Sequence, residues 1–360
     1  MLEKSNNLVH VIFSNKKLPL TKGGRGDSKD SAQILNPPKS PFEKGGLQSL
    51  LSYRKYKTLL IVVMFSLIAA CSNNNSKHRL LIGVSYQNLQ NEFVINIQDA
   101  VRAKAKELNI ELIELDSQGK SENQISQVEN FIAREVDAII LNPFDKEGSA
   151  PAVDIAVREK KPIVVLNAIV SNLQKANAYV GSEDAEAGRI AARYIMDLLK
   201  GKGDIAVIHG PNGHSAEVQR SEGIRQALQK YPDAKIVVEQ TANWDRAQAL
   251  ALMENWLASG RTINAVIAQN DEMALGAYKA IEAAGKQKEI LVIGIDAIQD
   301  ALRAVSENKL AATVFQDAHG QGALAVELAK KLIDGQKPEH NNYIPFKLVT
   351  KENLSEFMKR

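Results

Sequence analysis

Between residues 79 and 349 the chain alternates short apolar runs with longer segments in which apolar residues recur every three or four positions. The first run, residues 79–84, precedes Phe93, Ile97 and Val101, which share one face of a helix. Short apolar runs predict buried strands, and the wider spacing predicts amphipathic helices. Strands that are apolar throughout and alternate with helices indicate parallel sheets covered on both faces. The sequence therefore predicts an α/β fold.

The expected elements are too numerous for one small sheet. A chain of 360 residues has room for about two domains, so we expect two doubly wound parallel-sheet units in succession. The expected strands are residues 79–84, 110–115, 137–142, 162–167, 176–182, 204–210, 234–240, 264–270, 290–296, 310–316 and 343–349. The expected helices are residues 93–108, 121–134, 152–160, 184–200, 216–230, 245–258, 272–284, 300–308 and 320–333.

Polar residues stand at or directly after the ends of many expected strands. They are Ser85, Asn142, Asn167, His209, Asn270, Asp296 and Gln316. In parallel sheets ligands bind at the carboxyl ends of the strands, which makes these residues candidate contacts. Asn and Asp at such positions also serve as helix caps or turn formers, and this alternative stays open for each single position. Their number favours a shared polar cleft.

Residues 51–71 form a separate pattern. A basic start is followed by an apolar stretch of ten residues that includes one serine, by the small pair Ala69-Ala70 and by Cys71, with a polar linker at residues 72–78. This order is typical of a secretory signal, and the apolar run is shorter than the roughly 20 residues of a membrane span. Its end resembles a bacterial lipobox, which implies lipidation of Cys71. The alternatives are an uncleaved anchor or a signal in which the cysteine is incidental.

Residues 1–50 precede this signal and are rich in Gly, Pro, Ser and Asn, which predicts disorder. An export signal normally begins a chain, so our hypothesis is that translation starts near residue 50 and that residues 1–50 are not translated. The first 57 residues hold 11 of the 45 Lys and Arg residues but 4 of the 42 Asp and Glu residues. The remainder is therefore slightly acidic, which argues against nucleic acid as a partner.

The motifs of common enzymes are missing. With Cys71 as the single cysteine, no disulfide within the chain and no thiolate zinc site can form. The chain has no Gly-rich phosphate loop, no Gly-x-Ser-x-Gly motif and no metal-ligand spacing among its six histidines; we expect His209 and His214 to hydrogen-bond locally. The sequence predicts a binding protein without catalytic activity, cofactor or metal.

Several segments resemble one protein family in both order and spacing. They are AQNDEMALGA at 268–277, LVIGID at 291–296 and KLAATVFQ at 309–316, with ELDSQGK at 114–120, ILNP at 140–143, SEGIRQAL at 221–228 and NWDRAQAL at 243–250. From about residue 79 to residue 349 the chain thus resembles the periplasmic ribose-binding protein family, which comprises sugar-type solute-binding proteins of ABC transporters.

The resemblance implies a type I periplasmic-binding fold, in which three crossing segments form a hinge between two α/β lobes that close on a ligand. The first lobe would comprise residues 79–182 plus 317–345, and the second residues 183–316 plus 346–360. It also implies a monomer in the cell envelope that passes a small ligand, such as a sugar, to an ABC permease. The alternative is a receptor that presents its closed form to a chemoreceptor or membrane kinase.

Position by position, the resemblance implies a set of ligand contacts. They are Ser85, Asn91, Phe93, Asn142, Asn167, Trp244, Asn270, Asp296 and Gln316. Such a set suits a sugar, because a carboxylate accepts from neighbouring hydroxyls, amides donate and accept, and aromatic rings cover the apolar faces of the ring.

Three positions depart from the ribose receptor. Its fourth strand ends in an Asp-Arg pair that is Asn167-Ala168 here, and a second pocket arginine is matched by Val218. Each charge-assisted hydrogen bond is worth about 1.5–3 kcal/mol, so the loss of two guanidinium groups should weaken ribose binding severely unless Gln219 or Tyr86 compensates. We therefore expect a ligand other than ribose.

Overall fold

The computed structural model of the protein describes residues 79–358. The predicted segments 1–50, 51–71 and 72–78, with the predicted lipidation site Cys71, lie outside the described residues. Within residues 79–358 no helix combines the length and the apolar character needed to cross a membrane.

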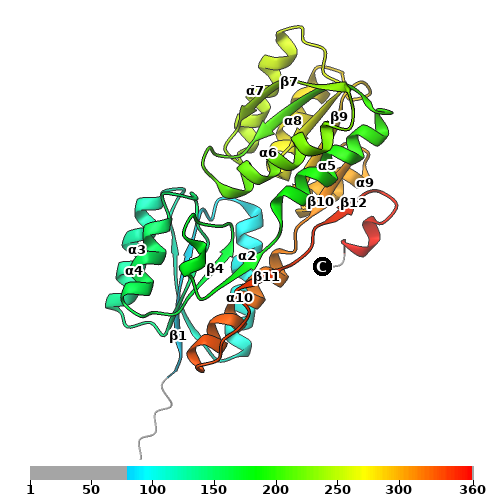
Figure 1. Ribbon diagram of the computed structural model, residues 1–360. Helices are drawn as coiled ribbons and strands as arrows, with labels where there is room; N and C mark the ends of the chain where they lie inside the picture. The colour runs from blue at the N-terminus through cyan, green and yellow to red at the C-terminus, as the bar shows by residue number, and fades with distance from the viewer. Residues whose placement is uncertain (1–78, 359–360) are drawn as a thin grey trace, which may run out of the picture. The chain divides into compact units, whose positions relative to one another are not determined.

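Two six-stranded sheets form the framework (Figure 1). The strands are β1 (Leu81–Tyr86), β2 (Glu111–Asp116), β3 (Ala138–Leu141), β4 (Ile163–Asn167), β5 (Ala178–Gly181), β6 (Lys202–His209), β7 (Asp233–Thr241), β8 (Ala265–Ala268), β9 (Leu291–Asp296), β10 (Ala312–Phe315), β11 (Asn341–Tyr343) and β12 (Lys347–Val349). Their order is β11-β5-β4-β3-β1-β2 in the first sheet and β12-β10-β9-β8-β6-β7 in the second. All neighbours are parallel except β12, which pairs antiparallel with β10.

Helices cover both faces of each sheet. They are α2 (Glu92–Glu107), α3 (Ser121–Ala133), α4 (Ala150–Arg158), α5 (Asp184–Leu198), α6 (Ser215–Leu228), α7 (Arg246–Ala258), α8 (Asp271–Ala283), α9 (Gln299–Ser306) and α10 (Ala318–Ile333). On the first sheet, α3 and α4 lie on one face and α2 and α10 on the other; on the second, α5 and α6 lie opposite α7, α8 and α9 (Figure 1). We call these units the first and second lobe. The prediction of two doubly wound lobes is confirmed.

Strand β4 shows why the expected strands are apolar throughout. Successive side chains of a strand point to opposite faces of the sheet. Ile163 and Val165 join the core beneath α3 and α4, whereas Val164 and Leu166 join the core beneath α2 and α10. Because helices cover both faces, neither side of the strand tolerates polar residues before its carboxyl end.

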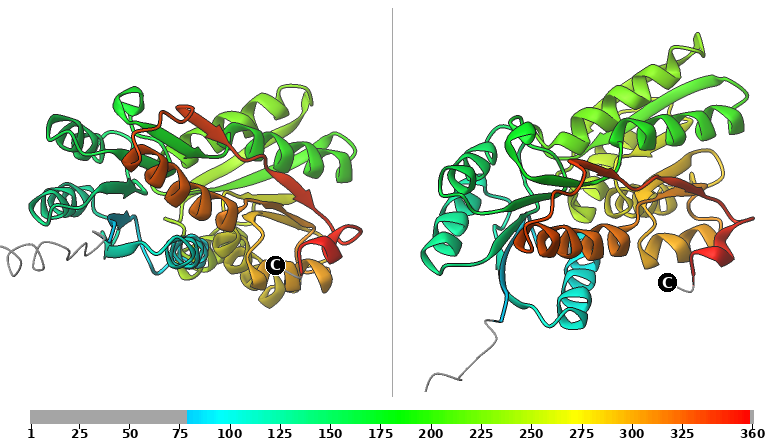
Figure 2. Two further views of the ribbon diagram at one scale, coloured as in Figure 1. Left: turned by 90° about the horizontal axis from the view of Figure 1, so that it is seen from below. Right: turned by 60° about the horizontal axis from the view of Figure 1, so that its bottom comes forward.

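The chain passes between the sheets three times. The crossings are residues 182–183 between β5 and α5, 316–317 between β10 and α10, and 344–346 between β11 and β12 (Figure 2). The expectation of one strand at 343–349 is therefore wrong, because the segment forms parts of two strands that belong to different sheets. Pro345 lies between them and has no N–H to contribute to either sheet.

Candidate functional site

A cavity lies between the lobes, where Asn167 ends β4 and Asp296 ends β9. Its lining comes from both lobes and from one crossing: Gln87, Asn91, Phe93, Val94, Asn167, His214, Ala216, Arg220, Trp244, Asn270, Asp296 and Gln316. Of the sequence-predicted contacts, the structure thus brings together Asn91, Phe93, Asn167, Trp244, Asn270, Asp296 and Gln316. Their role in holding a ligand stays a prediction.

The lobes touch each other beside this cavity. His214 Nε2 of the second lobe lies 2.8 Å from Gln87 Oε1 of the first. The backbone N–H of Lys146 donates to the carbonyl of Gly213 at 3.0 Å. The volume of the cavity that the centre of a water-sized sphere can reach is about 30 Å³. The structure therefore shows the two lobes closed over a small volume.

Two asparagines of the cavity also cap helices. The side-chain oxygen of Asn91 accepts from the N–H of Phe93 at the start of α2, at 2.9 Å. The side-chain oxygen of Asn270 accepts from the N–H of Met273 at the start of α8, also at 2.9 Å. Capping fixes the amide oxygen and leaves the amide nitrogen as the group that can donate elsewhere. The two readings of these asparagines, cap and contact, are thus compatible.

Three cavity residues have left-handed backbone conformations. The φ angles are 68° at Asn167, 62° at Trp244 and 128° at Asp296. Each such residue costs about 1–3 kcal/mol, and strained residues concentrate at ligand sites, where the surrounding fold holds them in place. These backbone conformations orient the side chains that end β4 and β9 and the Trp244 ring, which precedes α7.

One polar group in the cavity has no partner in the protein, and a second is held only by a long ion pair. Gln316 is 2% exposed, and its Nε2 has no hydrogen-bond partner within the residues that the structure describes. No hydrogen bond within residues 79–358 reaches the carboxylate of Asp296, which lies 3.9 Å from Arg220 Nη1. Burial raises the pKa of Asp296, and Arg220 acts against this. An unmade buried hydrogen bond costs about 1–3 kcal/mol, so the Gln316 donor, with the Asp296 carboxyl group in the same cavity, marks a place for a ligand.

Arg220 of α6 is a cavity residue that the sequence comparison missed. It is 4% exposed and donates to Asp184 Oδ1 at 2.9 Å, to the carbonyl of Gln269 at 2.5 Å and to Gln316 Oε1 at 3.0 Å. Val218, the position matched to a pocket arginine, is 48% exposed and does not line the cavity. The expectation that both pocket guanidinium groups are missing is therefore wrong, because Arg220, two positions further along α6, supplies one.

Ser85 and Asn142 are not among the residues that line the cavity, and their assignment as ligand contacts stays a prediction. Both are fully buried. Ser85 Oγ donates to Gln127 Oε1 at 2.7 Å. The amide of Asn142 accepts from the N–H of Gln87 at 3.3 Å and donates to the carbonyl of Leu166 at 3.2 Å. These side chains are therefore occupied in holding the ends of β1, β3 and β4, and Asn142 supports the cavity residue Gln87.

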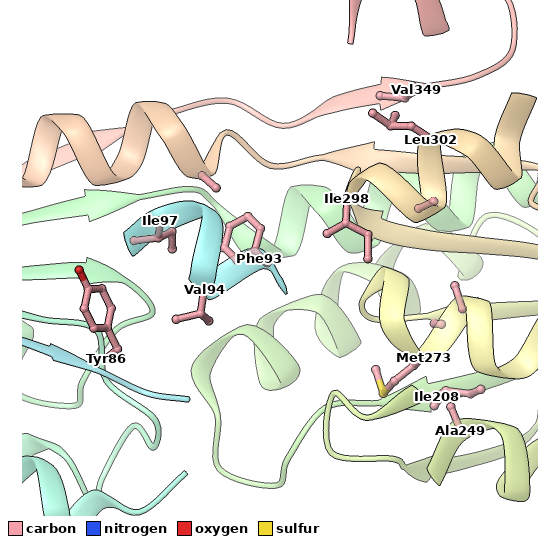
Figure 3. Packing of buried hydrophobic residues seen from close by; sticks show 14 of the residues in the cluster. Tyr86, Phe93, Val94, Ile97, Ile208, Ala249, Met273, Ile298, Leu302 and Val349 are labelled. Carbon is pink, nitrogen blue, oxygen red and sulfur yellow. The ribbon is translucent and has the colours of Figure 1, made fainter. Parts of the chain in front are cut away.

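Aromatic rings close two sides of the cavity. Figure 3 shows Phe93 on the side of α2 that faces Ile298 of the second lobe, and both belong to one buried cluster. Trp244 packs over the bare backbone of Gly210, where an added Cβ would lie 2.1 Å from the ring. The ring of His214 stands at 85° to that of Trp244, with centroids 5.4 Å apart. Burial, and to a lesser extent Arg220, lowers the pKa of His214 to about 3.

The residues missed at the sequence level carried a weak signal. Arg220 shares the buried side of α6 with Ala216, Gly223 and Ala227, which are spaced four, three and four positions apart. Arginine is mostly exposed in helices, so this periodicity alone does not single it out. His214 does bond locally, since its Nδ1 accepts from Ala216 N–H at 3.1 Å, but its other nitrogen reaches the opposite lobe. The other missed lining residues are Gln87, Val94 and Ala216, whereas Gln219 and Tyr86 do not line the cavity.

A cavity between two α/β lobes joined by three crossings defines a two-lobed solute-binding protein. Residues 82–337 match the family model described as a periplasmic binding protein domain. The chain belongs to this family of non-enzymatic solute-binding proteins, within the branch related to ribose-binding proteins. The predicted resemblance and the prediction of a non-enzyme are thereby confirmed.

Named relatives are similar over nearly their whole length. A putative rhizopine-binding protein of Rhizobium meliloti is 38% identical over 301 residues, which cover 82% of this chain and 97% of the relative. The ribose import binding protein of Bacillus subtilis is 33% identical, covering 83% of this chain and 100% of the relative. The structure of an ABC transporter solute-binding protein from Bacillus halodurans with bound myo-inositol is 41% identical with a TM-score of 0.77, covering 79% and 99% of the two chains.

Proposed function

We propose that this protein is the substrate-binding component of an ABC importer and that it captures an uncharged sugar or cyclic polyol other than ribose between its lobes. The observation that carries this proposal is the unpartnered amide nitrogen of Gln316, which shares the cavity with the Asp296 carboxyl group, itself 3.9 Å from Arg220 Nη1. A hydroxyl group both donates and accepts, so neighbouring hydroxyls of one polyol can satisfy both groups at once. The Phe93 and Trp244 rings then cover the carbon skeleton.

The charges favour a neutral solute. Arg220 is the cation that lines the cavity, and Asp184 already pairs with it at 2.9 Å. Asp296 adds a second buried carboxylate beside them. An anionic solute would therefore meet a buried carboxyl group in the cavity wall and no guanidinium free of carboxyl partners. The myo-inositol bound by the Bacillus halodurans relative is consistent with a neutral polyhydroxyl ligand.

The envelope context extends the proposal. In this proposal, residues 51–71 direct export, and a lipid on Cys71 anchors the protein at a membrane so that it faces the periplasm or the cell exterior. The closing units are residues 79–182 plus 317–345 and residues 183–316 plus 346–360. The monomer then passes its solute to a membrane permease.

Thermal unfolding with a panel of solutes tests the ligand class. The panel comprises myo-inositol, xylitol, D-allose, D-ribose and, as anionic controls, glucuronate and inositol phosphate. At 100 times its Kd a ligand stabilises the closed state by about 2.7 kcal/mol, which raises the Tm by about 5–10 °C. We expect such a rise with a neutral polyol, a smaller one with ribose and none with the anions. Stabilisation by the anions alone would refute the proposal.

The variants Gln316→Met and Asp296→Asn connect the ligand to the cavity. Both keep side-chain volume while removing the amide donor or the carboxylate acceptor. We expect each to abolish the Tm rise caused by the best neutral solute. Val218→Thr, at the exposed position on α6, is the control and should leave that rise unchanged.

A further inference from the structure

Arg220 lies where all three crossings enter the second lobe. Its guanidinium donates to Asp184, the residue directly after the first crossing, and to Gln316 in the second crossing. Its Cζ lies 5.9 Å from the ring centroid of Phe346 in the third crossing, within the range of a cation–π contact. The same group stands 5.7 Å from the Trp244 ring and lines the cavity. One buried cation therefore contacts both the hinge and the cavity.

This contact decides which way the Gln316 amide faces. A guanidinium group carries only donors, so the amide must turn its oxygen toward Arg220, and the distance of 3.0 Å from Nη2 to Oε1 agrees. The amide nitrogen then points away from Arg220 and is the atom left without a partner among the described residues. Without Arg220 the amide could rotate by half a turn and present its oxygen instead. Gln316 and Asp296 would then present the solute with two acceptors in place of one donor and one acceptor.

Asp184 holds the guanidinium in this place. The ion pair of Arg220 Nε and Asp184 Oδ1 is buried on both sides, with side chains 5% and 4% exposed. Helices α5 and α6 are in backbone contact, since a Cβ added to Gly188 would lie 2.2 Å from the carbonyl oxygen of Arg220. This contact leaves the helix that carries Arg220 little freedom to move against Asp184. A buried ion pair fixed at both backbones sets the direction of the remaining N–H groups.

We propose that Arg220, held by Asp184, is a positioning residue that fixes the Gln316 amide as a hydrogen-bond donor toward the bound solute. The inference deepens the proposed function and rests on it, because the donor acts on the captured polyol. The structure shows no direct hydrogen bond between Asp184 and Gln316. We therefore expect their effects on solute affinity to be coupled through Arg220.

A double-mutant cycle in the full chain tests this coupling. Asp184→Asn, Gln316→Met and the double variant are titrated calorimetrically with myo-inositol and with xylitol. We expect Asp184→Asn to weaken binding about 5- to 150-fold, and the double variant to bind no more weakly than Gln316→Met by itself, since the donor is already lost. Arg225→Gln, which removes an exposed ion pair from the same helix, is the matched control and should change Kd less than about twofold.

A second readout does not need a solute. The side-chain amide signals of Gln316 in ¹⁵N NMR of the solute-free protein should shift and broaden in Asp184→Asn but not in Arg225→Gln. Should Asp184→Asn fail to fold, Arg220→Lys replaces it, because a lysine keeps the charge but lacks the planar fork that reaches Asp184 and Gln316 together. Unchanged amide signals, or additive effects in the cycle, would overturn the inference. Shifted signals in a protein that binds none of the neutral polyols would support the positioning role while overturning the proposed function.

Discussion

Lowering the pH from about 7.5 to about 5 should weaken solute binding about 30-fold, because lobe closure buries the neutral ring of His214. In the closed structure the ring is 3% exposed, its Nδ1 accepts from Ala216 N–H, and its Nε2 lies 2.8 Å from Gln87 Oε1 across the lobe boundary. Arg220, on the same helix, adds a positive charge, while the rings of Phe144 and Trp244 pack edge-on against it. A second proton would displace the Ala216 bond in a site that disfavours charge.

The magnitude follows from the two pKa values of His214. Burial lowers the pKa to about 3 in the closed state, whereas opening exposes the ring and returns it to about 6.5. Because the pKa of His214 is lower in the closed state, the free energy of closure is fully favourable when the pH is above the open-state pKa. It becomes less favourable as the pH falls below the open-state pKa. At about pH 5 His214 is almost fully protonated in the open form and neutral in the closed form. Closure therefore loses about 2 kcal/mol of free energy, and the Kd for the solute rises about 30-fold.

Calorimetric titration with myo-inositol between about pH 7.5 and pH 5 measures this effect in the wild type and in His214→Asn. The asparagine oxygen can still accept from Ala216 N–H, so the start of α6 is preserved. Asp271, whose pKa burial raises to about 7, and Asp296, whose pKa burial also raises, are present in both proteins, so their contributions cancel in the ratio of the two dissociation constants. A ratio that stays constant over this pH range would refute the reasoning.

Further predictions concern single side chains. Gly210→Ala places a Cβ 2.1 Å from the Trp244 ring, so the ring must move; we expect about tenfold weaker binding and altered tryptophan fluorescence, and unchanged values for both would contradict the packing. Asn270→Ala removes the cap of α8, which should lower the free energy of unfolding by about 1 kcal/mol and the Tm by about 2–4 °C. Asn270→Asp keeps the cap and the Tm, but it loses the amide donor and should therefore bind the solute more weakly. Cys71→Ser should abolish incorporation of labelled palmitate and release the protein from the membrane fraction; retention of the label would exclude Cys71 as the lipidation site.

The alternation of apolar runs and helical periodicity was sufficient to predict the lobes, because both faces of each sheet are covered. It failed at residues 343–349, where one apolar run is divided between two sheets around Pro345. The local apolar pattern shows which residues are buried but not which of the two sheets they join. A crossing segment therefore cannot be recognised from periodicity alone. The antiparallel pairing of β12 was missed for the same reason.

The candidate site was predictable where a polar side chain ends a strand and faces the other lobe, as with Asn167 and Asp296. Ser85 and Asn142 also stand at strand ends, but their side chains form hydrogen bonds within the first lobe. This difference depends on tertiary contacts and is not visible in the sequence. Arg220 was hidden for a related reason. Its partner Asp184 lies 36 positions away in the chain, and only the contact of α5 with α6 brings the pair together.

A crystal structure with the neutral polyol that raises the Tm most tests the central claim directly. The account predicts the solute between the lobes, with one oxygen within hydrogen-bond distance of Gln316 Nε2 and a neighbouring hydroxyl donating to Asp296. A solute bound outside this cavity, or one that leaves both Gln316 Nε2 and the Asp296 carboxylate without a hydrogen bond, would contradict it.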